Sequence, residues 1–120
     1  MPKIYIDQGH NPSGANTGAE GNGLREQDVT YEVGRRLAAL LRRSGNWDVR
    51  LSRNTPDEVL GSSNASSLRT RVNEANSWGA DYFISVHTNG STDPSARGVE
   101  AYAYSRPSRA FNLGEDIVDS

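Results

Sequence analysis

The chain has 120 residues, a length that suits one domain with a single core and is too short for two. Its formal net charge of −2 argues against a nucleic-acid partner, because neutralising phosphates requires a basic face. The absence of cysteine excludes disulfides and thiolate metal sites, which leaves histidine and carboxylate side chains as the strong metal ligands.

The order of the expected elements is typical of a single α/β domain. Strands alternate with helices, which predicts a mostly parallel, twisted sheet with right-handed crossovers and helices on both faces. In the first half we expect a strand around residues 4–6, a glycine-containing polar loop at 11–24, a helix at 26–43 and a strand at 48–53. A second loop at 54–66 leads to a second helix, which runs from a cap at Ser66 or Ser67 to about Gly79. We then expect strands at 81–86 and 99–104 and a last helix from Ser105 onward, whose pattern continues to Ser120.

The apolar residues of the helices recur at helical spacing and predict which faces are buried. We expect the inner face of the first helix to consist of Val29, Val33, Leu37, Leu40 and Leu41, that of the second of Leu68, Val72 and Ala75, and that of the last of Ala110, Leu113 and Ile117. No stretch is long and apolar enough to span a membrane. The first strand begins almost at Met1, so we expect no signal peptide, and export by another route or through a segment outside this sequence.

The two histidines of the chain both follow buried-strand patterns. His10 ends the run that begins at Ile4, and His87 ends the run that begins at Tyr82. If both strands belong to one parallel sheet, both imidazoles lie at the same edge, where α/β proteins bind ligands. Two imidazoles at one edge suit a zinc ion, which then needs a third ligand.

A carboxylate is the expected third ligand, because a His-His-Glu set with an open position is a known catalytic zinc arrangement. Glu26, where the glycine loop enters the first helix, is the preferred candidate, and Glu20 in the same loop is an alternative that spacing alone leaves open. Asp7 precedes the first histidine closely enough to orient a ligand imidazole through a hydrogen bond.

Three further residues follow from their positions near the same edge. Arg53 ends the second strand, where it would either pair with a substrate carboxylate or hold the second loop. Arg71 lies within the second helix and is expected to fix the loop more than to contact substrate. Asn89 follows His87 closely enough to hydrogen-bond a substrate amide.

Five short motifs follow one another along the whole chain, and together they are more specific than any one of them. They are IDQGHNP at 6–12, GAEGNGLREQDV at 18–29, SLRTRVNEAN at 67–76, FISVHTN at 83–89 and GVEAY at 98–102. In order and spacing they resemble the zinc-dependent N-acetylmuramoyl-L-alanine amidases of the peptidoglycan-cleaving amidase-3 family. The resemblance implies zinc bound by His10, Glu26 and His87, and it prefers Glu26 over Glu20.

The first departure from the family pattern lies in the first motif. This chain has Gln8 and Asn11 where the family usually has proline and glycine, while Asp7, Gly9 and His10 stay in place. Because those three residues are kept, we expect the metal site to be kept as well.

The second departure concerns a further catalytic glutamate that the family carries near its carboxyl end. By the resemblance this glutamate would lie beyond Ser120, so we expect residues 1–120 to lack the last strand or strands of the family domain. Whether Glu100 replaces that glutamate as general base is a hypothesis.

The function that the resemblance implies is zinc-dependent hydrolysis of the amide bond between N-acetylmuramic acid and the L-alanine of the stem peptide. Two alternatives stay open: a peptidoglycan-binding module without activity, and a zinc carboxypeptidase or deacetylase on the same scaffold. The implied partner is peptidoglycan or a muropeptide, and we expect a monomer that acts on the cell wall in a secreted, spore or phage lytic system. A separate wall-binding domain is compatible with this reading.

Overall fold

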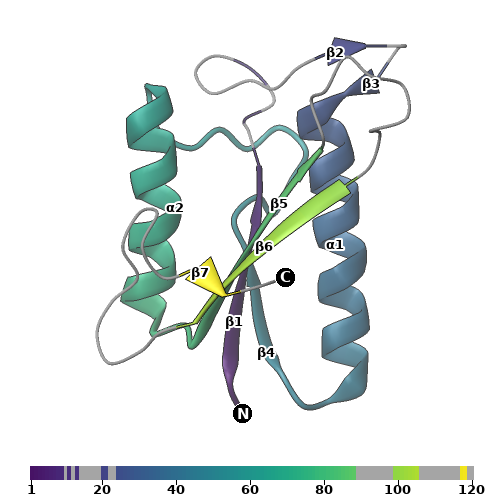
Figure 1. Cartoon of the computed structure of the whole chain (residues 1–120), viewed down its shortest axis with the longest axis vertical. Coiled ribbons are helices and arrows are strands. Elements are labelled where there is room, and N and C mark those ends of the chain that lie inside the picture. Colours follow the sequence, from purple (N-terminus) through teal and green to yellow (C-terminus); the bar gives the residue numbers. More distant parts are fainter. Residues whose placement is uncertain are drawn as a thin grey trace.

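A five-stranded sheet with one helix on each face makes up most of the described chain (Figure 1). The computed structural model describes residues 1–9, 11, 13, 20–21, 24–88, 99–105 and 117–118, and of residues 20–21, 24–26, 88, 99–100 and 117–118 it describes the backbone alone. The elements are β1 (Lys3–Gln8), β2 (Glu20–Gly21), β3 (Leu24–Arg25), α1 (Glu26–Ser44), β4 (Asp48–Leu51), α2 (Asn64–Trp78), β5 (Tyr82–Thr88), β6 (Val99–Ser105) and β7 (Ile117–Val118).

The sheet confirms the predicted α/β class. Its strand order is β4-β1-β5-β6-β7, with β1 parallel to both β4 and β5. Strands β6 and β7 add to β5 in antiparallel orientation, so the sheet is parallel on one side and antiparallel on the other. The short strands β2 and β3 form a separate antiparallel pair, which the sequence pattern did not predict.

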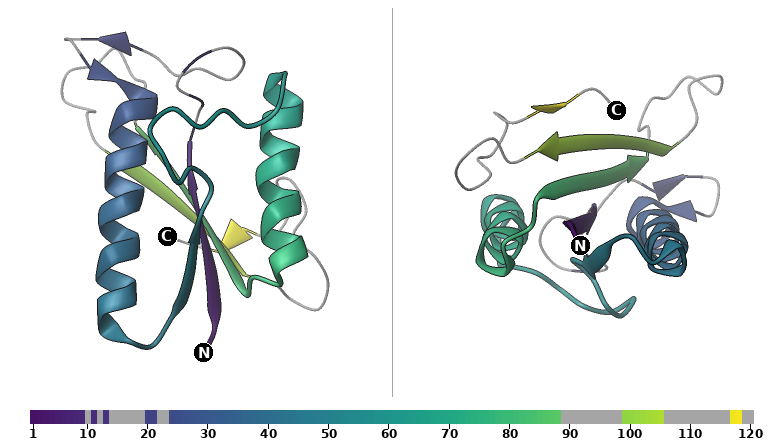
Figure 2. Two further views of the ribbon diagram at one scale, coloured as in Figure 1. Left: turned by 180° about the vertical axis from the view of Figure 1, so that it is seen from behind. Right: turned by 90° about the horizontal axis from the view of Figure 1, so that it is seen from below.

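Alternating side chains of the central strands build two cores, one on each face of the sheet. Figure 2 shows α1 and α2 on these opposite faces. Toward α1, the buried cluster consists of Ile4, Ile6, Ala38, Val49, Leu51 and Val86. Toward α2, it consists of Tyr5, Ala75, Ala80 and Phe83, with the Tyr5 and Phe83 rings stacked at 5.4 Å between centroids. Because successive strand residues point to opposite faces, β1 is buried on both sides, as its nearly continuous apolar run predicts.

Helix α1 has the predicted start at Glu26 and ends one residue beyond the predicted end, and Gly45 follows it with a φ of 76°. Helix α2 starts earlier than predicted, because Ser63 and not Ser66 is its N-cap. The Ser63 hydroxyl accepts from the backbone N–H of Ser66, and the Ser66 hydroxyl accepts from the backbone N–H of Ser63. This reciprocal pair is a capping box in which serine takes the usual place of Glu or Gln. No helix in the described residues is long and apolar enough to cross a membrane.

Two predicted core positions are wrong. Leu40 is 61% exposed and Leu68 is 41% exposed, because the apolar stripes facing the sheet are narrower than the sequence pattern indicates.

The predicted last helix is wrong at both described ends, since Ser105 is the last residue of β6 and Ile117–Val118 form β7. The short apolar run around Ile117 pairs with Ala103 and Tyr104, and periodicity alone does not separate such a strand from a helix. The helical pattern therefore does not run on toward Ser120 as predicted, because a strand interrupts it at 117–118. Residues 106–116 and 119–120 lie outside the described residues.

Replacing Ser63 by alanine removes the N-cap acceptor and should lower the free energy of unfolding by about 1 kcal/mol. Urea unfolding of the Ser63→Ala variant measures this loss. The matched control is Ser62→Ala, which removes an exposed hydroxyl next to the cap and should cost less than about 0.5 kcal/mol. Equal losses in the two variants would contradict the assigned cap.

Candidate functional site

The carboxyl ends of β1 and β5 meet the amino-terminal end of α1 at one edge of the sheet, at the top of Figure 1. Asp7 lies opposite Ser85 and Gln8 lies opposite Val86, so Gly9 and His87 come next to each other just beyond. This is the edge at which parallel α/β sheets bind ligands. The backbone therefore confirms that the end of β1, which precedes His10, and the end of β5, which contains His87, lie side by side as predicted.

Gly9 and the His87 ring are in close contact. A Cβ atom on residue 9 would lie 2.6 Å from Nδ1 of His87 and 2.7 Å from the Val86 carbonyl oxygen, so only glycine fits. The Gly9 N–H donates to the Val86 carbonyl oxygen at 2.9 Å, and the Gly9 carbonyl oxygen accepts from the Thr30 hydroxyl at 2.6 Å. His10 itself lies outside the described residues, but the residue before it is held against His87.

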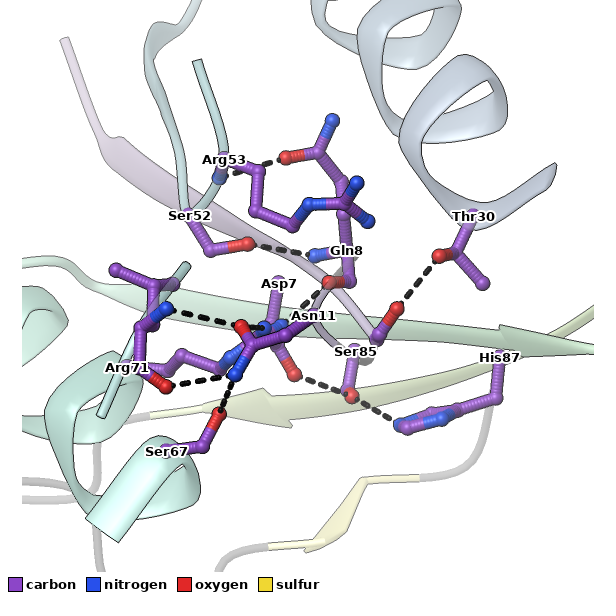
Figure 3. Close-up of polar contacts among 12 residues, drawn as sticks. Asp7, Gln8, Asn11, Thr30, Ser52, Arg53, Ser67, Arg71, Ser85 and His87 are labelled. Carbon is purple, nitrogen blue, oxygen red and sulfur yellow. Dashed lines mark hydrogen bonds and ion pairs between the residues drawn. The ribbon is translucent and has the colours of Figure 1, made fainter. Parts of the chain in front are cut away.

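A chain of polar contacts runs from His87 into the protein (Figure 3). Nε2 of His87 lies 2.8 Å from the hydroxyl oxygen of Ser85, two residues earlier on the same face of β5. The Ser85 hydroxyl donates to Oδ2 of Asp7 at 2.8 Å. Asp7 thus contacts His87 through Ser85 and not directly, whereas a direct contact of Asp7 with His10, which lies outside the described residues, stays a prediction.

Arg71 of α2 forms a buried ion pair with Asp7, with 2.7 Å between Nη1 and Oδ1. Asp7 is 3% exposed and Arg71 is 1% exposed, so water contributes little to screening the pair. Arg71 also donates to the Gln8 carbonyl oxygen and, at 3.0 Å, to Oδ1 of Asn11. Arg71 therefore fixes the end of β1 and the start of the loop that follows it, which is a structural role.

Asn11, a departure from the family pattern, ties its loop to the segment before α2. Its amide group donates to the Leu60 carbonyl oxygen and accepts from the Leu60 N–H, each at 2.9 Å. The same amide lies 3.4 Å from the Ser67 hydroxyl. Asn11 is fully buried, so these bonds replace the water contacts that an amide would otherwise need.

Gln8, which also departs from the family pattern, links β1 to α1 and to the end of β4. Its Nε2 donates to the Tyr31 carbonyl oxygen at 2.9 Å, and its Oε1 accepts from the Arg53 N–H at 2.8 Å. Gly34 makes room for this side chain, because a Cβ at residue 34 would overlap Cγ of Gln8. Proline at position 8 would leave the Tyr31 carbonyl and the Arg53 N–H without these partners.

Arg53 is fully buried, and its guanidinium donates to the carbonyl oxygens of Gln27 at 2.7 Å and Pro56 at 2.9 Å. These contacts hold the second loop to α1, which is the structural alternative that the sequence left open for this residue. Burial lowers the pKa of Arg53, and the nearby charge of Arg71 lowers it further. A contact between Arg53 and substrate stays a prediction.

Burial also affects two tyrosines on the α2 face of the sheet. Burial raises the pKa of the Tyr5 hydroxyl, and the hydrogen bond that this hydroxyl donates to Glu74 at 2.7 Å raises it further. Burial likewise raises the pKa of Tyr104, with a smaller contribution from the negative charge of Asp7. With these raised pKa values both hydroxyls stay neutral and add no negative charge beside the Asp7–Arg71 pair.

The remaining predicted site residues are placed only in part. Glu26 is the first residue of α1 at this edge, and Glu100 of β6 lies directly opposite His87 in the antiparallel register, but the side chains of both lie outside the described residues. Asn89 lies outside them entirely, and of the alternative ligand Glu20 only the backbone, in β2, is described. Among the described side chains, which include His87 but not His10 or Glu26, no three acidic or histidine residues form a metal cluster.

The expected position of the family's catalytic glutamate stays a prediction. Ser120, beyond which the resemblance places that glutamate, lies outside the described residues. The last described residues, Ile117–Val118, form a strand at the edge of the sheet next to β6. Within the described backbone, Glu100 is the β6 carboxylate that faces His87 in the register.

Sequence reasoning missed Ser85 and Tyr102. Ser85 precedes His87 by two residues in a strand, and this spacing signals a shared face. Tyr102 is 42% exposed and its ring lies edge-on to the His87 ring, with 6.4 Å between centroids. The pairing of β5 with β6 brings the two rings together, and nothing within either strand alone predicts that register.

Comparisons with known proteins place the chain in the family that its motifs resemble. The profile of the family Amidase_3, described as N-acetylmuramoyl-L-alanine amidase, matches residues 4–120. The N-acetylmuramoyl-L-alanine amidase CwlM of Bacillus licheniformis is 44% identical over 87% of this chain and 37% of its own length. The endolysin of Bacillus phage SPP1 is 30% identical over 93% of this chain and 37% of its own.

A solved structure supports the fold. The N-acetylmuramoyl-L-alanine amidase AmiC2 of Nostoc punctiforme superimposes with a TM-score of 0.63 and 33% sequence identity, over 77% of this chain and 46% of that one. The chain therefore spans little more than a third of the curated relatives named above and less than half of the solved structure.

Replacing Arg71 by methionine should lower the free energy of unfolding by about 3–5 kcal/mol, because it leaves the Asp7 carboxylate buried without its positive partner. The matched control is Arg69→Met on the same helix, where an exposed guanidinium is lost and about 0.5 kcal/mol or less is expected. Urea unfolding measures both. A loss below about 1 kcal/mol in the Arg71 variant would contradict the buried pair.

Proposed function

The chain belongs to the N-acetylmuramoyl-L-alanine amidase family Amidase_3, and on this basis we propose that it hydrolyses the bond between N-acetylmuramic acid and the L-alanine of the stem peptide. The proposed centre is a zinc ion held by His10, Glu26 and His87. The observation that carries the proposal is the packing of the His87 ring against Gly9, the residue before His10.

The donor set fits zinc in its chemistry. Two imidazoles and one carboxylate are usual ligands of catalytic zinc, and they leave a coordination position for water or substrate. Two described features of the chain support a ligand role for His87: Nε2 lies 2.8 Å from the Ser85 hydroxyl oxygen, and the ring packs against Gly9 at the edge where α1 begins. A metal ligand held by a hydrogen bond on its other nitrogen is the usual arrangement in proteins.

When bound, zinc would polarise the scissile carbonyl and lower the pKa of a bound water toward about 7. The part of the protein is to hold the ligands and to move a proton. Glu100 is the proposed general base: its carboxylate would take the proton of the attacking water and pass it to the leaving amine nitrogen. The register that sets Glu100 opposite His87 supports this role, because directly opposite residues of an antiparallel pair share a face.

The proposed substrate is peptidoglycan or a muropeptide, and the proposed place of action is the cell wall. The chain is also similar to a sporulation-specific N-acetylmuramoyl-L-alanine amidase of Bacillus subtilis, and together with the phage endolysin named above this similarity supports a secreted, spore or phage lytic role. We further propose that the chain acts as a monomer, that any wall-binding domain is separate, and that Asn89 contacts the substrate amide.

Zinc analysis tests the metal centre. The purified chain, loaded and then dialysed, should retain about one zinc ion, and His87→Ala and Glu26→Ala should each weaken zinc binding by about 100-fold or more. Glu20→Ala is the matched control because it removes the alternative carboxylate of the same loop, and its affinity should match the parent. No retained zinc in the parent, or a loss with Glu20→Ala and not with Glu26→Ala, would contradict the proposed ligands.

Digestion of purified sacculi, with and without a chelator, tests the reaction. The parent should release new L-alanine amino groups, and the chelator should abolish the release. A protein that sediments with sacculi and releases nothing would be a binding module. Products that have lost a terminal amino acid or an acetyl group, as shown by mass, would indicate a carboxypeptidase or a deacetylase.

Replacing Glu100 by glutamine should lower kcat by about 100-fold or more and leave zinc content unchanged, because general acid–base catalysis typically contributes about 100- to 10,000-fold. Glu32→Gln on the exposed side of α1 is the control and should keep parental activity. The muropeptide assay and metal analysis, run on the same samples, separate the two effects. Parental kcat in the Glu100 variant would remove this residue from the mechanism.

A further inference from the structure

Ser85 links the His87 ring to the buried Asp7–Arg71 ion pair. The hydroxyl oxygen lies 2.8 Å from Nε2 of His87 and 2.8 Å from Oδ2 of Asp7. Ser85 is 6% exposed, so water does not readily replace either partner. Figure 3 shows the hydroxyl between the carboxylate and the imidazole.

The positions of the protons follow from counting donors. A serine hydroxyl has a single proton, and the Asp7 carboxylate, paired with Arg71, accepts hydrogen bonds without donating any. The Ser85 proton therefore goes to Asp7, and the contact with His87 requires Nε2 to carry a hydrogen that it donates to Ser85. In a neutral imidazole the lone pair then lies on Nδ1.

Nδ1 is also the ring nitrogen on the Gly9 side. A Cβ on residue 9 would lie 2.6 Å from Nδ1 and 2.7 Å from Cε1, so this edge of the ring packs against the main chain just before His10. On β6 the Tyr102 ring meets the same imidazole edge-on. The ring is thus held on several sides, and the proton count identifies Nδ1 as the nitrogen that keeps the lone pair.

We propose that Ser85 is a positioning residue that fixes His87 as the Nε2–H tautomer and thereby presents Nδ1 to the metal. This inference rests on the proposed zinc centre for its purpose. Its first consequence, the tautomer, does not depend on metal or activity. Asp7 and Arg71 contribute by keeping the Ser85 hydroxyl proton directed away from the ring.

Nitrogen-15 NMR of the metal-free chain at about pH 8, where imidazoles are neutral, reads the tautomer directly. The chain has two histidines, so a His10→Gln variant assigns the His87 signals. The parent should show His87 with hydrogen on Nε2, and Ser85→Ala should shift the population toward a mixture of tautomers. Hydrogen on Nδ1 of His87 in the parent would overturn the proposal.

Zinc affinity, measured by competition with a chelating dye, tests the consequence for the metal. Ser85→Ala should bind zinc about 10- to 100-fold more weakly, the range typical for residues that orient a ligand, and Ser85→Thr should recover most of the loss because it keeps the hydroxyl. The matched control is Ser52→Ala: its buried hydroxyl accepts from the Gln8 N–H at 2.8 Å, on the other side of β1.

Ser85→Ala and Ser52→Ala should lower the melting temperature of the metal-free chain by similar amounts, whereas zinc affinity should fall in the Ser85 variant alone. Parental affinity in Ser85→Ala, or an equal loss in both variants, would overturn the positioning role. Absence of zinc binding in the parent, together with the Nε2–H tautomer, would instead refute the proposed zinc centre and leave the assignment of the hydrogen bonds standing. If Ser85→Ala does not fold, two measurements still test the positioning role: the tautomer of His87 in the parent, and the zinc affinity of Ser85→Thr.

Discussion

The buried ion pair between Arg71 and Asp7 is the interaction on which the candidate site at the carboxyl edge of the sheet depends. It joins α2 to the end of β1, and the same guanidinium holds the Gln8 carbonyl oxygen and the Asn11 amide. A buried pair of this kind gains little over an apolar contact, but each partner is costly to remove alone. The pair fixes the position of two groups: the end of β1, and the Asp7 carboxylate that contacts His87 through Ser85.

The two departures from the family pattern in the first motif are part of this same arrangement. Gln8 joins β1 to Tyr31 of α1 and to Arg53, and Asn11 joins the loop to Leu60. Both side chains are fully buried. Proline or glycine at these positions would make none of these side-chain hydrogen bonds, so in this chain side-chain hydrogen bonds help to hold the first motif.

Much of the fold was predictable because its signals are local. The apolar runs of β1 and β5, the periodicity of α1 and the glycine after each helix identify the elements, and parallel strand ends bring Gly9 and His87 together. What sequence reasoning missed depends on pairing between distant segments. The place of Ser85 between Asp7 and His87 requires the register of β1 and β5, and β7 gains its strand form from its pairing with β6.

A crystal structure of the zinc-loaded chain, with the metal located by anomalous scattering, tests the central claim most directly. We predict a single strong site at the carboxyl edge, bound by His10, Glu26 and Nδ1 of His87. Nε2 of His87 should donate to the Ser85 hydroxyl oxygen, and Asp7 should stay paired with Arg71. Ligation through Nε2 of His87, or a metal bound away from this edge, would contradict it.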